Sequence, residues 1–480
     1  MRVVVVGAGI TGLTTALGIL DDRPGAQVVV LEAGDRDGGK ILTAPFAGHP
    51  VDCAADAFLA RVPDAIALCD RLGLADELVT PAQRTAYLFS RGTLHRFPPG
   101  LVLGVPTDLD ALARSGVVSA EGVARAALDL TMGPDQWVAG ADGTGTDETR
   151  TDETVGDLVR RRLGDEVYEV LVGPLLSGVN AGNADHLSLA AGAPQFAVAI
   201  RDHGSLIAGA RAQLAASAAN APDAPVFYGL VGGMGRLVDA LRQAIDDAGG
   251  DIRHGTPVER IAAVPAGGFT VTTRATDPDR PATTVAADAV VVTTPLYVTA
   301  PLVAPLAPEV ADAMAQVEYA SPVMITLAVP KAAVDHPLDA SGFLVAGREG
   351  LVLTACSWAS SKWAHLDSPA TAILRASAGR HHDDRPGAMD DDRLVATVLD
   401  DLATTMGLHG PPDAVRVTRW PRSLPQFRAG HLDRVAEWRA ALSAVAPGLL
   451  VAGAGCEGLG LPACVRQGRA AAKMVVDLQF

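Results

Sequence analysis

The chain of 480 residues is short of the residues that mark several protein classes. Aromatic residues make up only 4%, and no two cysteines form a CxxC pair. The five cysteines are Cys53, Cys69, Cys356, Cys456 and Cys464. An odd number of scattered cysteines in a long chain argues against a disulfide framework or a zinc knuckle. We therefore expect a reduced protein.

Long apolar runs and a signal sequence are also missing. No uninterrupted apolar run is long enough to cross a membrane. The start, MRVVVVGAG, enters a strand without the charged region and cleavage site of a signal peptide. We expect a cytoplasmic protein, with peripheral membrane contact left open.

The adjacent His381 and His382 lie in an acid-rich stretch typical of a solvated loop, so we assign no metal.

The sequence has no excess of positive charge. Lysine and arginine number 39 against 55 aspartates and glutamates, for a net charge of −16. This balance argues against a nucleic-acid partner and against general attraction to an anionic membrane. Because 49% of the residues are hydrophobic and 20% are charged, a large core can be buried. The length predicts two or three intertwined units.

A glycine pattern near the start points to a nucleotide. Residues 2–6, RVVVV, predict a buried strand, and Gly7, Gly9 and Gly12 follow as G-x-G-x-x-G at the mouth of a helix. The first glycine permits a tight turn, the second lets a pyrophosphate approach the backbone, and the third lets helix and strand pack closely. Strand, helix and a second strand at 28–31 predict a βαβ unit.

The residues after this unit narrow the choice of nucleotide. Glu32 follows Gly12 by 20 residues, where a carboxylate binds the adenosine ribose and would repel the 2′-phosphate of NADP. Gly38 and Gly39 then predict a second close approach of the backbone to a longer cofactor, which favours FAD over NAD. No second nucleotide fingerprint follows, since GGMG at 232–235 has the wrong spacing and predicts a helix start. Without a nicotinamide site, an oxidase that reduces O2 is favoured over a reductase.

The end of the chain repeats the order of strand, glycine turn and helix. A strand at 449–452 leads into Gly453, Gly455, Gly458 and Gly460, and a helix starts near Pro462. A helix N-terminus aimed at the flavin would stabilise the anionic reduced ring. We expect an α/β fold, with a Rossmann-like FAD-binding domain, an interleaved α+β substrate domain and a helical insertion. The predicted boundaries are 1–75, 226–300 and 440–480 for the FAD domain, 76–105, 190–225 and 301–439 for the substrate domain, and 106–189 for the insertion.

Longer stretches of the sequence resemble a known family. They are GAGITGLTTA with EAGDRDGGKI, RRRLGDEVYEVLVGPLLSGVNAGNADHLSL, TACSWASSKWAH, VTRWPRSLPQFRAGH and VAGAGCEGLGLPACVRQGRAA. The chain resembles the flavin amine-oxidase superfamily, and within it the bacterial protoporphyrinogen/coproporphyrinogen III oxidases of the soluble Gram-positive type. The resemblance implies the cofactor FAD, a porphyrinogen substrate oxidised with O2 in haem biosynthesis, and coproporphyrinogen III as that substrate. It leaves open a hand-over of product to a ferrochelatase, and the sequence does not define an oligomer.

The same resemblance implies roles for individual residues. The residues it places around FAD are Gly7, Ala8, Gly9, Ile10, Thr11, Gly12, Glu32, Ala33, Gly39, Lys40, Ala54, Ala55, Asp56, Ala57, Val258, Trp420, Gly453, Leu459, Gly460 and Leu461. No catalytic side chain stands out, because the flavin itself accepts the hydride. Asp56 is the one candidate, as a group that orients a pyrrole N–H or takes a proton, and its alternative is a turn or surface acid.

The substrate residues carry the departures from the family pattern. Arg61 is a candidate partner for a propionate or else a solvated arginine, and Val179 and Asn180 form a cavity wall or a glycine-rich turn. Relatives often have a Gly-Pro pair where this chain has Ala54 and Ala55, and aromatic side chains where it has Ser377 and Asn180. These changes keep other interpretations open. The alternative interpretations are a protoporphyrinogen IX oxidase, an amine oxidase or carotenoid desaturase, and a non-catalytic FAD-binding or scaffold protein.

Overall fold

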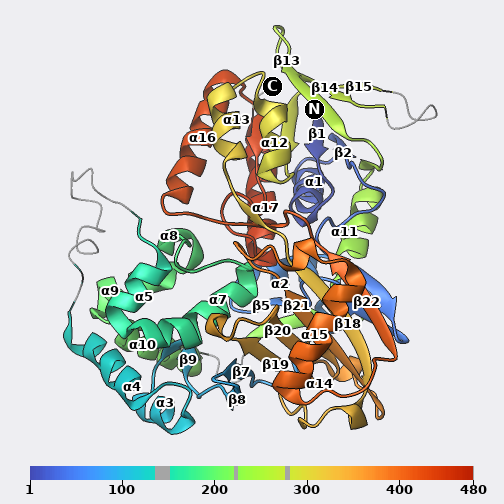
Figure 1. Ribbon diagram of the computed structural model, residues 1–480. Helices are drawn as coiled ribbons and strands as arrows, with labels where there is room; N and C mark the ends of the chain where they lie inside the picture. Colours follow the sequence, from blue (N-terminus) through green and yellow to red (C-terminus); the bar gives the residue numbers. More distant parts are fainter. Residues whose placement is uncertain (134, 136–151, 221–224, 276–281, 479–480) are drawn as a thin grey trace. The chain divides into compact units, whose positions relative to one another are not determined.

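The computed structural model describes residues 1–133, 135, 152–220, 225–275 and 282–478 (Figure 1). The chain forms two compact units. The first comprises Met1–Thr80, Val226–Glu318 and Leu432–Phe480, and the second comprises Pro81–Pro225 and Tyr319–His431. The chain therefore passes between the units four times. The division into an FAD domain, a substrate domain and an insertion stays a prediction.

A parallel five-stranded sheet forms the centre of the first unit. Its order is β12 (Asp251–Arg253), β2 (Gln27–Leu31), β1 (Arg2–Val6), β16 (Ala289–Val292) and β24 (Leu449–Val451). Val3–Val6 of β1 pair in register with both neighbouring strands. The two faces of β1 belong to two different hydrophobic clusters, Val3 and Val5 in one and Val4 and Val6 in the other. Because β1, β2 and β16 are buried on both faces, their sequences are nearly continuous runs of valine.

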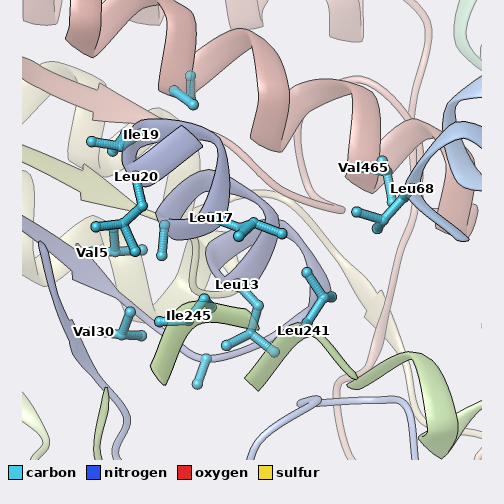
Figure 2. Packing of buried hydrophobic residues seen from close by; sticks show 14 of the residues in the cluster. Val5, Leu13, Leu17, Ile19, Leu20, Val30, Leu68, Leu241, Ile245 and Val465 are labelled. Atoms are coloured by element: carbon cyan, nitrogen blue, oxygen red, sulfur yellow. The ribbon is translucent and has the colours of Figure 1, made fainter. Parts of the chain in front are cut away.

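Helices α1 (Ile10–Asp22) and α17 (Leu461–Asp477) pack on one face of this sheet with α11 (Gly235–Asp247) (Figure 2). Leu13, Leu17 and Ile245 fill the space between the helices and the strands. Glycine lets α1 and α17 lie unusually close together. A Cβ on Gly18 would lie 2.8 Å from Cβ of Ala472, and one on Gly468 would lie 2.7 Å from the Thr11 carbonyl. The first βαβ unit and the last helix therefore form one core.

Smaller elements complete the first unit. They are the hairpin β3 (Thr43–Phe46) and β4 (His49–Asp52), the sheet of β5 (Phe58–Leu59), β11 (Phe227–Leu230) and β6 (Leu78–Val79), the sheet of β13 (Val258–Ala263), β14 (Phe269–Thr273) and β15 (Thr284–Ala287), and the helices α2 (Pro63–Arg71), α12 (Leu296–Val303), α13 (Pro308–Ala315) and α16 (His431–Val445). The sequence of 60–80 predicts a helix closed by the Gly73 region, and α2 ends at Arg71, just before that glycine. Gly73 adopts φ +72°, and the chain beyond it forms a short turn and β6.

A seven-stranded sheet forms the centre of the second unit. Its order is β22 (Ala414–Arg419), β18 (Val323–Pro330), β21 (Thr371–Ala378), β20 (Leu353–Trp358), β19 (Gly342–Val345), β7 (Tyr87–Ser90) and β8 (Thr93–Arg96). Alternate residues of β18 and β21 form a core together with Leu394, Val398 and Leu402 of α15 (Asp391–Met406). The runs PVMITLAV, GFLVA, LVLTACSW and AILRAS predict strands and residues 391–407 predict a helix, and β18, β19, β20, β21 and α15 confirm them.

The second unit also contains a helical part. Its helices are α3 (Leu109–Ser115), α4 (Ala120–Ala127), α5 (Val155–Leu163), α6 (Asp165–Val167), α7 (Gly173–Asn180), α8 (Leu189–Gly192), α9 (Pro194–His203) and α10 (Leu206–Asn220). The remaining elements are β9 (Leu101–Val102), β10 (Val105–Pro106), β17 (Tyr319–Ala320), β23 (Leu424–Pro425) and α14 (Ala359–Lys362). The polar stretch 139–154 predicts a surface linker; it lies mostly outside the described residues, and α5 begins directly after it.

Candidate cofactor site

The glycine turn after β1 has a different constraint at each glycine. Gly7 adopts φ +101°, a conformation that side chains with a Cβ rarely take. A Cβ on Gly12 would lie 1.9 Å from the Gly7 carbonyl oxygen, so this position has no room for a side chain. A Cβ on Gly9 would meet nothing within 4 Å. The turn is therefore packed tightly at Gly12 and open at Gly9, which fits a ligand that approaches the backbone at Gly9.

Three loops meet at the carboxyl edge of the sheet. Thr293, directly after β16, donates from its hydroxyl to the carbonyl of Val6 at 2.9 Å and to that of Gly7 at 3.1 Å. On the other side, a Cβ on Gly453 after β24 would lie 3.2 Å from the Thr293 carbonyl oxygen. The strands that follow β1 lie on opposite sides of it, with β2 on one side and β16 on the other. Open α/β sheets bind ligands at such a switch point. Thr293 is not among the residues predicted from the sequence, where its place in VVVTTP directly after a valine run was the one available signal.

Glu32 lies at the end of β2, beside the glycine turn. Its two carboxylate oxygens accept hydrogen bonds from the backbone N–H groups of Ala8 at 2.8 Å and Gly34 at 2.7 Å. The N–H of Thr256 donates to the Glu32 carbonyl at 2.8 Å, which brings the segment before Val258 alongside. Glu32, Ala33 and Val258 thus come from adjacent segments. The carboxylate is held at the place where the fingerprint predicts a ribose-binding acid.

The second glycine pair packs against the first. The N–H of Gly38 donates to the Ala8 carbonyl at 2.8 Å, and a Cβ on Gly39 would lie 3.2 Å from Cα of Gly9. Arg36 holds this loop by donating to the carbonyls of Asp37, Gly39 and Ile41 at 2.5–3.1 Å. These glycines therefore let two backbone segments approach each other. Their approach to a flavin stays a prediction.

Lys40 and the glycine-rich C-terminal loop meet at Cys464 of α17. Burial lowers the pKa of the half-buried Lys40 ammonium, and the neighbouring Cys464 acts in the opposite direction. Burial raises the pKa of the Cys464 thiol, whose Sγ lies 3.7 Å from the carbonyl oxygen of Leu459. Two regions predicted to contact the cofactor, 39–40 and 459–461, are thus neighbours in the first unit.

Residues 53–57 lie just after β4, which ends at Asp52. Asp52 is 8% exposed, and its Oδ1 accepts from Thr43 Oγ1 and, at 2.9 Å, from the N–H of Met234. Thr43 Oγ1 in turn accepts from the N–H of Gly235 at 2.8 Å. The pair thus caps the start of α11, and the prediction of a helix start at GGMG is confirmed. Ala54, Ala57 and Asp56 are half-buried, Ala55 and Arg61 are exposed, and their proposed roles stay predictions.

The other predicted site residues belong to the second unit. Asn180 ends α7, and its carbonyl accepts from Nε2 of Gln426 at 3.1 Å, while the side chain of Val179 lies outside those that the structure describes. Ser377 pairs with Met324 on the face of β21 turned away from the α15 core. The N–H of His381 donates to the Ala181 carbonyl at 2.6 Å, so the segments after α7 and β21 are neighbours. Trp420 follows β22 and is half-buried.

Comparison with known proteins identifies the class to which this fold and site belong. The chain matches the model of the flavin-containing amine oxidoreductases over residues 10–476, and it belongs to that family. It is 33% identical to the coproporphyrinogen III oxidase of Bacillus subtilis (strain 168), covering 100% of this chain and 98% of that protein. The protein of the same name from Mycobacterium tuberculosis (strain ATCC 25618 / H37Rv) is 35% identical, with coverages of 98% and 97%.

Solved structures agree with this assignment. A protein from Exiguobacterium sp. 255-15, described as a candidate protoporphyrinogen oxidase, has a TM-score of 0.82 and 30% identity, covering 99% of this chain and 98% of its own. Cyclohexylamine oxidase from Brevibacterium oxydans IH-35A shares the fold, with a TM-score of 0.67 at 18% identity. The predicted α/β fold and family are therefore confirmed. Among the described residues, no helix combines the length and apolarity needed to cross a membrane.

The family implies a flavin, and the carboxyl edge of the first sheet fits one. Space is open in front of Gly9, where a pyrophosphate would approach. The Glu32 carboxylate stands beside that turn, and the glycine-rich loop before α17 lies at the same edge. The residues at this edge of the sheet thus fit a bound flavin.

Proposed function

We propose that this protein is an FAD-dependent coproporphyrinogen III oxidase. The observation that carries the proposal is full-length identity of 30–35% to proteins of that name from several bacteria, joined to a glycine turn that is open at Gly9. The reaction is coproporphyrinogen III plus three O2 giving coproporphyrin III plus three H2O2. Six electrons and six protons leave the macrocycle, and each O2 takes two of each.

FAD is the flavin we propose. The turn at Gly7, Gly9 and Gly12 would hold the pyrophosphate on the free N–H groups at the start of α1. Glu32 would bind the adenosine ribose, exchanging its bonds to Ala8 and Gly34 for ribose hydroxyls, and Val258 would contact the adenine through its backbone. FMN has no adenosine half and could not use Glu32. The C-terminal residues 453, 459, 460 and 461 would line the flavin ring.

The protein residues bind, orient and exclude water. When bound, a flavin supplies the two-electron acceptor for each oxidation step and passes the electrons on to O2. The N-terminus of α17 would favour negative charge at its end, an effect of about 0.3–1 kcal/mol per charge where exposed. Asp56 would orient a pyrrole N–H or take its proton. Arg61 would pair with a propionate, and Asn180, Val179 and Ser377 would contact the macrocycle.

The test is aerobic turnover by the purified holoprotein. A yellow protein with a flavin spectrum, given coproporphyrinogen III in air, should produce porphyrin fluorescence and close to three molecules of peroxide per porphyrin. Bound FAD with no porphyrin above the uncatalysed rate would reject the proposed activity. A colourless protein that does not take up added FAD would reject the cofactor as well.

A protoporphyrinogen IX oxidase is the second candidate. It is favoured by the Exiguobacterium structure and by a 28% identical relative, protoporphyrinogen oxidase 1 of Arabidopsis thaliana chloroplasts, which covers 96% of this chain. Coproporphyrinogen has four propionates and protoporphyrinogen two, so the ratio of kcat/KM values for the two substrates separates these candidates. A ratio in favour of protoporphyrinogen would change the substrate and leave the reaction type intact.

A further inference from the structure

The glycine-rich loop before α17 is held from inside by one amide side chain. Gln467 lies on α17 and is only 2% exposed. Its Oε1 accepts a hydrogen bond from the N–H of Gly453 at 3.2 Å, and its Nε2 donates to the carbonyl of Gly458 at 3.4 Å and to that of Ala463 at 3.3 Å. One side chain therefore connects the start of the loop, its far end and the helix that follows.

The Gln467 amide adds to the other bonds that hold this glycine-rich loop. Gly453 and Gly458 adopt φ +129° and +127°, outside the range of regular structure. Within the loop, the N–H of Cys456 bonds to the Gly453 carbonyl at 3.0 Å. From outside, Arg439 pairs with Glu457. Glutamine suits the inner position since it offers an acceptor to one N–H and donors to two carbonyls without a charge.

We propose that Gln467 is a positioning residue for the flavin, acting through the loop from Gly453 to Gly460. The inference rests on the proposed function in one respect, that this loop faces the flavin ring. Because the amide ties both ends of the loop, it determines where the residues between them lie relative to the start of α17. Losing it leaves the buried N–H of Gly453 without the acceptor that Gln467 provides, and it removes one donor to the half-buried carbonyl of Gly458.

The first variant is Gln467→Met, which keeps the length of the side chain and removes both its donor and its acceptor. We expect the dissociation constant of FAD from the apoprotein to rise about tenfold or more, the scale seen when residues that support metal ligands are mutated. A displaced loop should weaken the binding of the anionic reduced flavin more than that of the oxidised form. A further tenfold difference between the two forms would lower the two-electron midpoint potential by about 30 mV.

The matched control is Gln243→Met on α11 of the same unit. Gln243 is exposed, and its Nε2 donates to Asp247 at 2.8 Å, so the same chemical change removes a hydrogen bond away from the loop. The control should leave the FAD dissociation constant and the potential unchanged. Equal effects of the two variants would overturn the inference.

A second variant, Gln467→Glu, tests the hydrogen bonds directly. An ionised carboxylate accepts from Gly453 but repels the Gly458 carbonyl, whereas the protonated form has an acceptor for Gly453 and one O–H donor for the Gly458 carbonyl. Burial favours the protonated form, so we expect the FAD affinity of this variant to recover between about pH 8 and about pH 5, beyond any change in the wild type. A purely structural role would not produce this recovery.

The outcomes separate this inference from the proposed function. Gln467→Met with an FAD constant within twofold of the wild type and an unchanged potential would overturn the inference, as would variants that all stay unfolded in excess FAD. Wild-type protein that binds FAD but does not oxidise coproporphyrinogen would reject the proposed function and leave the comparison of Gln467 variants valid. Wild-type protein that does not bind FAD would reject both.

Discussion

At several positions in this protein, the atoms around a residue decide which side chain or protonation state that position can hold. Gly12 has no room for a methyl group, while Gly9, three residues earlier, faces open space. His336 in the second unit shows the same dependence for a titratable group. Its ring lies 4.6 Å from that of Trp358 and 4.8 Å from that of Tyr87, and its Nδ1 accepts from the N–H of Leu338 at 3.1 Å. That bond requires a neutral imidazole with the proton on Nε2.

The stability of the protein should therefore fall in mild acid because of His336. Burial lowers the pKa of this imidazole below its usual 6.5, so the unfolded chain binds the proton first as the pH falls. The stability that depends on the neutral ring is complete above pH 6.5 and is lost as the pH drops through that value towards the pKa in the folded state. Asparagine can accept the same bond from Leu338 without titrating. We expect His336→Asn to flatten the slope of unfolding free energy against pH between about 7.5 and 5.

Urea unfolding at a series of pH values measures this slope. His203→Asn, on an exposed position at the end of α9, is the matched control and should leave the slope unchanged. A His336→Asn protein with the full wild-type slope would assign the acid sensitivity to other groups.

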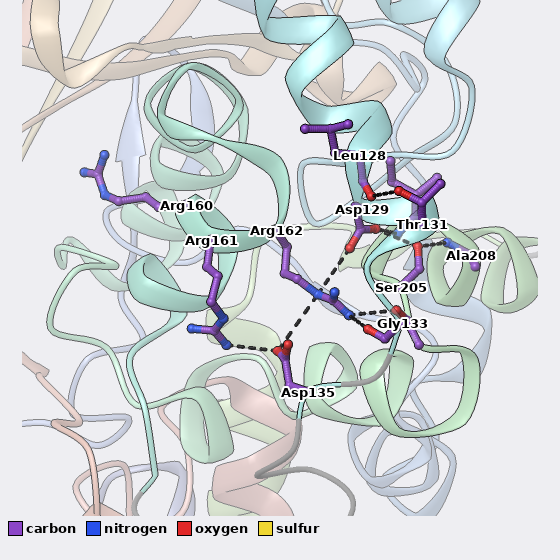
Figure 3. A network of polar contacts seen from close by, with 12 residues as sticks. Leu128, Asp129, Thr131, Gly133, Asp135, Arg160, Arg161, Arg162, Ser205 and Ala208 are labelled. Atoms are coloured by element: carbon purple, nitrogen blue, oxygen red, sulfur yellow. Dashed lines mark hydrogen bonds and ion pairs between the residues drawn. The ribbon is translucent and has the colours of Figure 1, made fainter.

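At the scale of elements, helix α5 directs three consecutive arginines to three places (Figure 3). Arg160 pairs with Asp165 and Asp185, Arg161 pairs with Asp135 and Glu153, and Arg162 points into the core. Consecutive residues of a helix are about 100° apart, so one of three must face inward when the helix lies on a core. The buried Arg162 pairs with the buried Asp129 at 3.3 Å and donates to the carbonyls of Gly133 and Gly204 at 2.6 and 2.7 Å.

Removing Arg162 alone should be strongly destabilising. In Arg162→Met the Asp129 carboxylate stays buried with Ser205 and the N–H of Ile207 as its partners but without a countercharge. Breaking a buried pair in this way costs about 3–5 kcal/mol of unfolding free energy. The double variant Arg162→Met with Asp129→Asn should recover much of that loss, since the amide oxygen can accept both remaining bonds.

Chemical denaturation of the wild type, both single variants and the double variant gives the coupling between the two residues. Additive effects of the two substitutions would show that the pair does not act as a unit. Arg161→Met is a suitable comparison, because its ion pairs with Asp135 and Glu153 are partly exposed and should cost much less.

At the scale of the whole molecule, no single cut of the chain separates the two units. The central sheet of the first unit takes β1 and β2 from the first segment, β12 and β16 from the second and β24 from the third. A domain can fold alone only when its own core is present. The path of the chain thus makes the first unit depend on residues from both ends.

Fragments cut between residues 225 and 226 should therefore not fold independently. The fragment 1–225 lacks three of the five strands that hold Gly7 and Glu32 in place. We expect it to show no cooperative unfolding of the βαβ unit and no binding of FAD, and co-expression with 226–480 to restore both. Circular dichroism, amide NMR spectra and flavin absorbance measure the outcome. A fragment 1–225 that binds FAD with wild-type affinity would contradict the assignment of the core to all three segments.

Much of the fold was predictable because its signals are local. Valine runs buried on both faces marked β1, β2 and β16, and glycine with amphipathic spacing marked α1, α11 and α17. The helix predicted within 60–80 closes near Gly73 as expected, but only tertiary context decided that the chain beyond it pairs as β6. The sequence did not predict that Gly38 and Gly39 pack on the first turn, and their approach to a flavin stays a prediction.

By itself, the sequence determined the class of cofactor and the order of strands and helices. Glycine spacing and an acid at a set distance are properties of contiguous residues, and they need no knowledge of what lies nearby in space. Only the tertiary structure decided that Gln467 supports the C-terminal loop, that Thr293 braces the turn at Gly7, and that Arg162 is buried. Thr293 is 286 residues from its partner Gly7, and a hydrogen bond across that separation has no pattern within either segment. The chain must fold before these partners exist.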